Sequence, residues 1–161
     1  MDDKSRIVYL MNKLGFHISD IKDSDKGFDA RIRIQKLVFF AKSLGADFSY
    51  SFSMYLHGPY SPDLTRDYYS LKNEDFIVIQ RDSSIDNIME NLKILNEQET
   101  VWLETAATIL DVKKSNPRLH WKDIISHVSN IKSEILKQAG KDSEYVNSVK
   151  DDLKKLNLIF N

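Results

Sequence analysis

The sequence predicts an α+β fold that is mostly helical: one domain with a small antiparallel sheet. Three observations predict it. Apolar residues recur at helical spacing in most segments of the 161-residue chain. Residues 48–56 instead alternate apolar and polar side chains, as a strand with one buried face does. The steps Gly58-Pro59 and Ser61-Pro62 then mark a tight turn and the start of another helix.

The composition excludes several classes of protein. Hydrophobic residues make up 42% and charged residues 29%, with a net charge of −1, so no global field favours nucleic acid or an anionic membrane. The chain has no cysteine, which excludes disulfides and thiolate chemistry. Its start lacks the pattern of a signal peptide, and its apolar runs are far too short to span a membrane. We therefore expect a cytoplasmic protein.

The first expected elements are helical. Residues 2–14 carry apolar side chains at helical spacing and end at Gly15. Residues 16–27 are polar and predict a surface loop. The next helix, from the N-cap Asp29 to Gly45, is apolar over more than one face, which predicts a position at the centre of the core.

Two strands and a third helix follow. Residues 48–56 form the first expected strand, and residues 76–79 (Phe-Ile-Val-Ile) form a second that pairs with it. Between them Ser61 is the expected N-cap of a helix over 62–71, with proline at its first position. The order helix, helix, strand, helix, strand predicts a winged-helix-like amino-terminal region.

The second half of the chain is expected to be helical. Residues 85–92 favour a short helix, although 91–95 fit a third strand equally well. The remaining expected elements are a helix at 97–114, an apolar stripe at helical spacing over 121–135, and a final helix from 142 onward. No flexible linker separates the halves, so we expect one domain over 1–161, in which the helical region 97–161 packs on the mixed helix-and-strand region 1–82.

His57 is the candidate residue for catalysis. It ends the first expected strand, and Asp63 or Asp67 would be the orienting acid of a triad. However, no Gly-x-Ser-x-Gly nucleophile motif accompanies it, so a hydrolase centred on His57 ranks below a structural role in which the ring bonds a backbone carbonyl. The histidines lack the spacing of a zinc site, and no phosphate-binding glycine motif is present. We expect no enzyme, and assign no catalytic residue, metal ligand or cofactor.

Binding surfaces are the better-supported possibility. Aromatic side chains gather around the expected turn, and a tyrosine combines apolar area with a hydrogen bond, as protein-binding surfaces require. The predicted partner-binding residues are Tyr55, His57, Tyr60, Arg66 and Tyr69. The candidate nucleic-acid contacts are Arg31, Arg33 and Lys36. Twelve basic and twelve acidic residues in 1–82 disfavour binding to DNA phosphates.

Two segments in this order resemble the Panacea-domain family, the SocA-like antitoxins. Residues 35–42 read Gln-Lys-Leu-Val-Phe-Phe-Ala-Lys, and residues 55–64 read Tyr-Leu-His-Gly-Pro-Tyr-Ser-Pro-Asp-Leu. The Gly-Pro-Tyr-Ser form is also similar to YwgA-like uncharacterised proteins. Tyr60 and Ser61 replace the small apolar residues usual after the Gly-Pro, and the helix over 143–161 has no counterpart in the family.

This resemblance implies a non-enzymatic, antitoxin-like module that binds a partner protein, namely a toxin encoded beside it, and neutralises or regulates that partner. The alternative is a winged-helix-like, DNA-binding transcriptional regulator. The sequence does not identify the partner or the oligomeric state.

Overall fold

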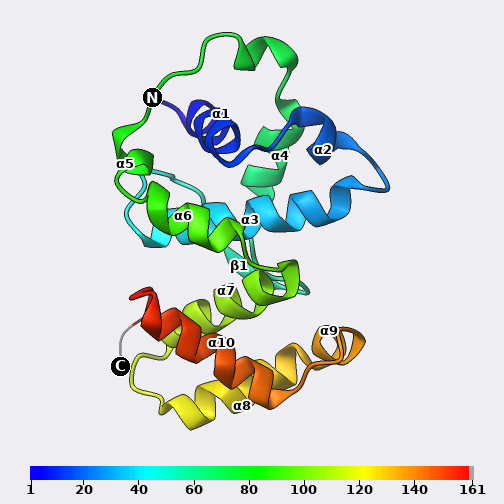
Figure 1. Ribbon diagram of the computed structural model, residues 1–161, viewed down its shortest axis with the longest axis vertical. Helices are drawn as coiled ribbons and strands as arrows, with labels where there is room; N and C mark the ends of the chain where they lie inside the picture. Colours follow the sequence, from blue (N-terminus) through cyan, green and yellow to red (C-terminus); the bar gives the residue numbers. More distant parts are fainter. Residues whose placement is uncertain (160–161) are drawn as a thin grey trace.

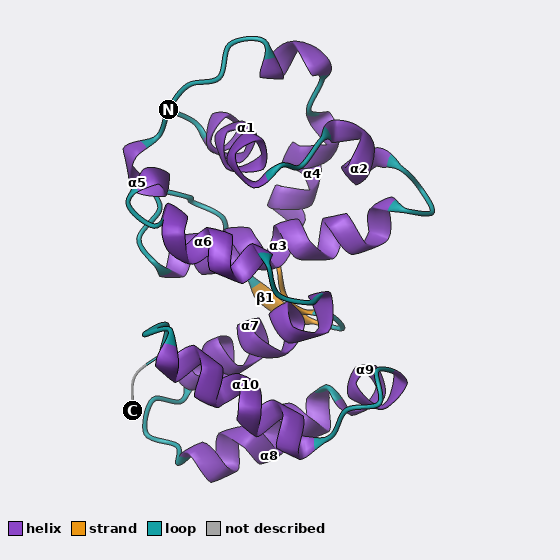
Figure 2. Ribbon diagram, viewed as in Figure 1, coloured by secondary structure: helices purple, strands orange, loops and turns teal. Residues whose placement is uncertain are grey.

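The computed structural model describes residues 1–159, which are mostly helical and include one small two-stranded antiparallel sheet (Figure 2). The long helix α3 (Gly27–Ser43) crosses the middle of the molecule (Figure 1). The other helices, in chain order, are α1 (Asp3–Leu14), α2 (Ile18–Lys22), α4 (Pro62–Ser70), the 3-10 helix η1 (Asn73–Phe76), α5 (Ser83–Asp86), α6 (Met89–Asn96), α7 (Thr100–Ser115), α8 (Trp121–Ile131), α9 (Ser133–Gln138) and α10 (Ser143–Lys155). The predicted fold class, mostly helical α+β, is confirmed.

Helix α3 forms the centre of the core, as its apolar circumference predicts. Ile34, Leu37 and Phe40 are fully buried, and α7 packs against the same helix. On its other side α7 contacts α8 and α10, so one continuous core connects both halves of the chain (Figure 1). The helix begins at Gly27, two residues before the predicted N-cap, and Asp29 lies instead in its first turn.

The sheet is a hairpin rather than the predicted pairing of distant segments. Strand β1 (Ser53–Tyr55) pairs with β2 (Gly58–Tyr60), and Tyr55 lies opposite Gly58. The hairpin lies between α3 and α7 (Figure 2). The predicted alternation of burial holds for Phe48 and Tyr50, which are buried, but the chain from 48 to 52 is not a strand. The alternation then fails, because Met54 and Leu56 are exposed.

Two other expected elements are wrong. Residues 76–79 form no strand: η1 ends at Phe76, and Ile77 and Val78 are 78% and 86% exposed. The first strand pairs instead with β2, the segment that directly follows its turn. The polar stretch 16–27 contains the short helix α2 rather than only a loop. Of the two alternatives for residues 85–95 the helical one is confirmed, because residues 91–95 lie within α6.

Helix starts agree better with the sequence. The side chain of Ser61 accepts a hydrogen bond from the amide of Leu64 at the start of α4, and Asp142 caps the start of α10 in the same way. Helix α1 ends at Gly15 in the left-handed conformation, also as predicted. Within residues 1–159, no helix combines the length and apolar character needed to cross a membrane.

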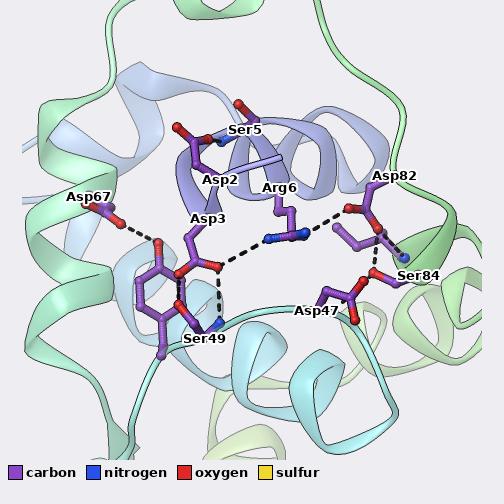
Figure 3. Close-up of polar contacts among 11 residues, drawn as sticks. Asp2, Asp3, Ser5, Arg6, Asp47, Ser49, Asp67, Asp82 and Ser84 are labelled. Atoms are coloured by element: carbon purple, nitrogen blue, oxygen red, sulfur yellow. Dashed lines mark hydrogen bonds and ion pairs between the residues drawn. The ribbon is translucent and has the colours of Figure 1, made fainter.

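Polar contacts anchor helix α1 to the segments that surround it (Figure 3). Asp3 accepts hydrogen bonds from the amide and hydroxyl of Ser49. Arg6 donates from Nε to Asp82 over 3.0 Å, and Asp82 also caps α5 by accepting from the Ile85 amide. In this cluster the guanidinium has carboxylate partners and the acceptors have donors, so the buried polar groups are satisfied.

Candidate functional site

His57 lies in the turn between β1 and β2 and contacts the second half of the chain. Its Nδ1 is 2.6 Å from Oε1 of Glu104, a residue of α7 that is only 4% exposed. The expected bond to a backbone carbonyl is therefore replaced by one to a buried carboxylate. The acids proposed for a triad lie elsewhere: Asp63 pairs with Arg66, and Asp67 accepts a hydrogen bond from Tyr50.

Two buried lysines hold the backbone of the hairpin from opposite sides. Lys36 of α3 donates from Nζ to the carbonyl of Pro59 over 2.7 Å. Lys132, between α8 and α9, donates from Nζ to the carbonyl of Leu56 over 3.0 Å. Both residues are almost completely buried, with exposed fractions of 1% and 2%. Cations this deep are rare in proteins unless they are paired.

The electrostatics of the two lysines differ from those of surface lysines. Burial, together with the positive charge of Lys132, lowers the pKa of Lys36 to about 7, and Glu104 opposes the shift. Burial also lowers the pKa of Lys132 to about 8, again opposed by Glu104. Glu104 is thus the carboxylate that both lysines share.

Gln35 joins α3 to the start of α4. Its amide accepts a hydrogen bond from the Ser61 backbone N–H over 2.9 Å and donates to the Ser61 carbonyl over 3.0 Å. The same amide donates to the Thr65 hydroxyl, which in turn donates to Tyr60 Oη over 2.5 Å. These bonds fix the position of Tyr60 relative to α3 and α4.

A cavity of about 190 Å³ lies between the hairpin, α3 and α4. Its lining combines aromatic and apolar walls with a few polar groups: Phe28, Arg31, Ile32, Gln35, Lys36, His57, Tyr60, Thr65, Tyr68 and Tyr69. We call it the hairpin cavity. Such a combination is typical of a ligand pocket or of an anchor site for a partner's side chain.

Exposed apolar side chains lie in the lining of the hairpin cavity and on the hairpin next to it. Phe28 is 53% exposed, Tyr55 52%, Leu56 68% and Tyr69 45%. The Phe28 ring meets the His57 ring edge to face, with centroids 5.3 Å apart. We call these four side chains the aromatic rim, and together with the cavity they make a hollowed apolar surface.

The structure brings most of the predicted partner-binding residues to this one place. Tyr55 and Tyr60 contact each other ring to ring at 5.1 Å, and His57, Tyr60 and Tyr69 all line the hairpin cavity. Arg66 is the exception: it is absent from the cavity lining, its side chain is 74% exposed, and it pairs with Asp63 at 3.0 Å.

The candidate nucleic-acid contacts have structural partners. Lys36 is buried, beyond the reach of a DNA phosphate at the surface. Arg33 donates to the carbonyls of Asn96 and Gln98 and thereby holds the α6–α7 connection. Arg31 donates to the carbonyls of residues 21 and 23 and lies over the Tyr69 ring at 5.9 Å.

Two central members of the site, Glu104 and Lys132, were not identified from the sequence. The sequence nevertheless contains a feature that marks each of them. Glu104 is the one charged residue within the otherwise uncharged run 100–110. Lys132 follows Val128 by four residues and so falls on the apolar stripe of 121–135. A charge on a buried helical face indicates a partner inside the fold.

In the described residues 1–159, no three His, Asp or Glu side chains are grouped so as to hold a metal ion. Searches against protein-family models, curated proteins and solved structures each gave no match to this chain.

Proposed function

We propose that the chain is a cytoplasmic, non-enzymatic interaction module of antitoxin type, which binds a partner protein and neutralises or regulates it. The observation that carries the proposal is the aromatic rim around the hairpin cavity. A partner side chain inserted into a cavity, with apolar contacts around it that exclude water, is the usual arrangement of a binding hot spot.

Exposure supports this role for the hairpin. In a short strand and its turn, Tyr55 and Leu56 extend apolar area into solvent, whereas the backbone beneath them is held rigidly by Lys36 and Lys132. A preorganised surface loses little conformational entropy on binding, and this favours affinity. The resemblance of residues 35–42 and 55–64 to Panacea-domain proteins favours a toxin as the partner.

Growth rescue tests the proposal directly. The gene beside this one is expressed in a test host, with and without this protein, and growth is measured. We expect the neighbour to inhibit growth and this protein to relieve the inhibition. Leu56→Asp should abolish relief, because it replaces the most exposed apolar side chain of the rim with a charge. Ile77→Asp is the matched control: Ile77 is 78% exposed but lies in the segment after η1, which lines a different cavity.

Relief that is equal for wild type, Leu56→Asp and Ile77→Asp would contradict a rim-mediated interaction. A neighbour without any effect on growth, combined with the absence of a specific complex, would contradict the antitoxin assignment itself. The DNA-binding alternative makes its own prediction: binding to random duplex DNA that weakens steeply with salt.

A further inference from the structure

Positive charge exceeds negative charge inside the site. Lys36 and Lys132 contribute +2 when protonated and Glu104 contributes −1, which leaves +1 among these buried side chains. Among the basic side chains that line the cavity with Lys36, Arg31 adds a further positive charge and His57 adds no negative charge. A buried ammonium without a counter-charge is unfavourable, so the site favours an added negative charge.

Hydrogen-bond donors are available at the same place. Lys36 has three N–H donors, and among the described residues one of them is used, on the Pro59 carbonyl. Tyr60 Oη accepts from Thr65, so its own proton is not needed for that bond. Both residues line the hairpin cavity. An ammonium and a phenol are donors that suit the two oxygens of a carboxylate.

The size and the walls of the cavity define the rest of the ligand. A volume of about 190 Å³ exceeds the roughly 150 Å³ of a cavity known to hold benzene. Phe28, Tyr68 and Tyr69 supply aromatic faces, and Ile32 adds an apolar one. A phosphate dianion fits less well, because it has no apolar body to fill the cavity.

From these observations we infer that the hairpin cavity is a binding site for a small aromatic monocarboxylate, whose carboxylate contacts Lys36 and Tyr60 and whose ring lies between Phe28 and Tyr69. Binding of this kind requires no partner protein, so it can be tested separately from the proposed antitoxin role, although both use the same cavity. The lowered pKa of Lys36, about 7, has a consequence for this site: the carboxylate binds more tightly when Lys36 is protonated.

The test uses the whole chain labelled with ¹⁵N and titrated with benzoate or 3-phenylpropionate, followed in ¹H–¹⁵N spectra. We expect saturable shifts of the amides of Phe28, His57 and Tyr69. Benzamide, the neutral analogue of benzoate, should bind at least about tenfold more weakly, because it cannot provide the missing charge. Affinity for benzoate should fall about tenfold from pH 6 to pH 8 as Lys36 with a pKa of about 7 loses its proton.

Variants locate the site. Lys36→Met should reduce benzoate affinity to that of benzamide, whereas Arg66→Met, which removes an exposed cation outside the cavity, should leave it unchanged. If Lys36→Met does not fold, two measurements still test the site. Tyr69→Ala should weaken benzoate binding, and wild type should still bind benzoate more tightly than benzamide. Equal binding of benzoate and benzamide, or no saturable shifts with either carboxylate, would overturn the inference.

A free small molecule is the source to which we commit, but the carboxyl end of a partner chain carries the same chemistry. A short peptide that ends in phenylalanine separates the two. Tighter binding of the peptide than of 3-phenylpropionate, lost on amidation of its carboxylate, supports the same site chemistry and assigns it to a chain terminus.

Discussion

The molecule contains two polar clusters that differ in charge balance. Around α1, Arg6 lies close to two carboxylates, Asp3 and Asp82, and both carboxylates accept further hydrogen bonds (Figure 3). Around the hairpin, two buried lysines share the single carboxylate of Glu104. The first cluster is complete by itself and holds helices together. The second cluster is more deeply buried and has fewer carboxylates than cations, as is typical of a site that binds an anionic ligand.

Removing the shared carboxylate should have the largest effect. Glu104→Gln leaves Lys36 and Lys132 buried without an anion, and we expect a loss of about 3 kcal/mol in the free energy of unfolding at pH 7. Urea denaturation measures it. Asp82→Asn in the other cluster should lose only about 1 kcal/mol, because asparagine still caps a helix and Arg6 keeps Asp3. Equal losses in the two variants would remove the distinction between the clusters.

The hairpin turn should be the next most sensitive position. Gly58 has φ +93°, and a Cβ there would lie 2.9 Å from Thr108 Oγ1. Gly58→Ala therefore combines backbone strain with a clash against α7, and we expect a loss of about 2 kcal/mol. Gly140→Ala is the matched control, since Gly140 also has positive φ (+69°) but no atom within 4 Å of the added carbon. Thermal unfolding of both variants measures the two losses. An equal loss in Gly140→Ala would contradict the contribution of the clash with α7.

The change in stability per pH unit should be smaller than the effect of either substitution. Lys36 has a pKa of about 7 in the folded protein and an ordinary value of 10.5 in the unfolded chain. Between these values the unfolded chain binds the extra proton, so stability rises with pH from about 7, by up to about 1.4 kcal/mol per pH unit. Lys132 acts in the same direction from about 8.

Chemical denaturation from pH 6.5 to 9 measures this slope. Lys36→Met should have a shallower slope than wild type, because the variant lacks the titrating group. Lys22→Met is the control, since Lys22 bonds a backbone carbonyl at the edge of the core rather than within the site. A wild-type slope that is unchanged by Lys36→Met would contradict the assignment of the lowered pKa to this lysine.

Much of the helical framework could be predicted, because its signals are local. The caps Ser61 and Asp142 and the stop at Gly15 act within one helical turn, and the apolar stripes of α3 and α8 depend only on spacing. Four of the five predicted partner-binding residues also gather at one surface: Tyr55, His57 and Tyr60 lie in the hairpin, and Tyr69 of α4 lines the cavity beside it. That they bind a partner stays a prediction.

Strand pairing and charge pairing could not be predicted in the same way. The segment 76–79 has strong β character, yet it forms no strand: the chain folds back on itself in a local hairpin instead, and Ile77 and Val78 extend into solvent. His57, Glu104, Lys36 and Lys132 are distant in the sequence, and their interaction depends on how α7 packs against α3.

By itself the sequence therefore determined most of the helices and the gathering of aromatic residues near Gly58, whereas the turn predicted at Gly58-Pro59 lies just before it, at 56–57, and both residues belong to β2. Those features arise from hydrophobic periodicity, caps and backbone restriction, which act over a few residues. Only the tertiary structure decided that Lys36 lies inside rather than on a nucleic-acid-binding face, that His57 has a carboxylate partner, and that a cavity exists beside them. The physical reason is that burial, and with it the pKa of a lysine, is set by elements that meet only in the folded protein.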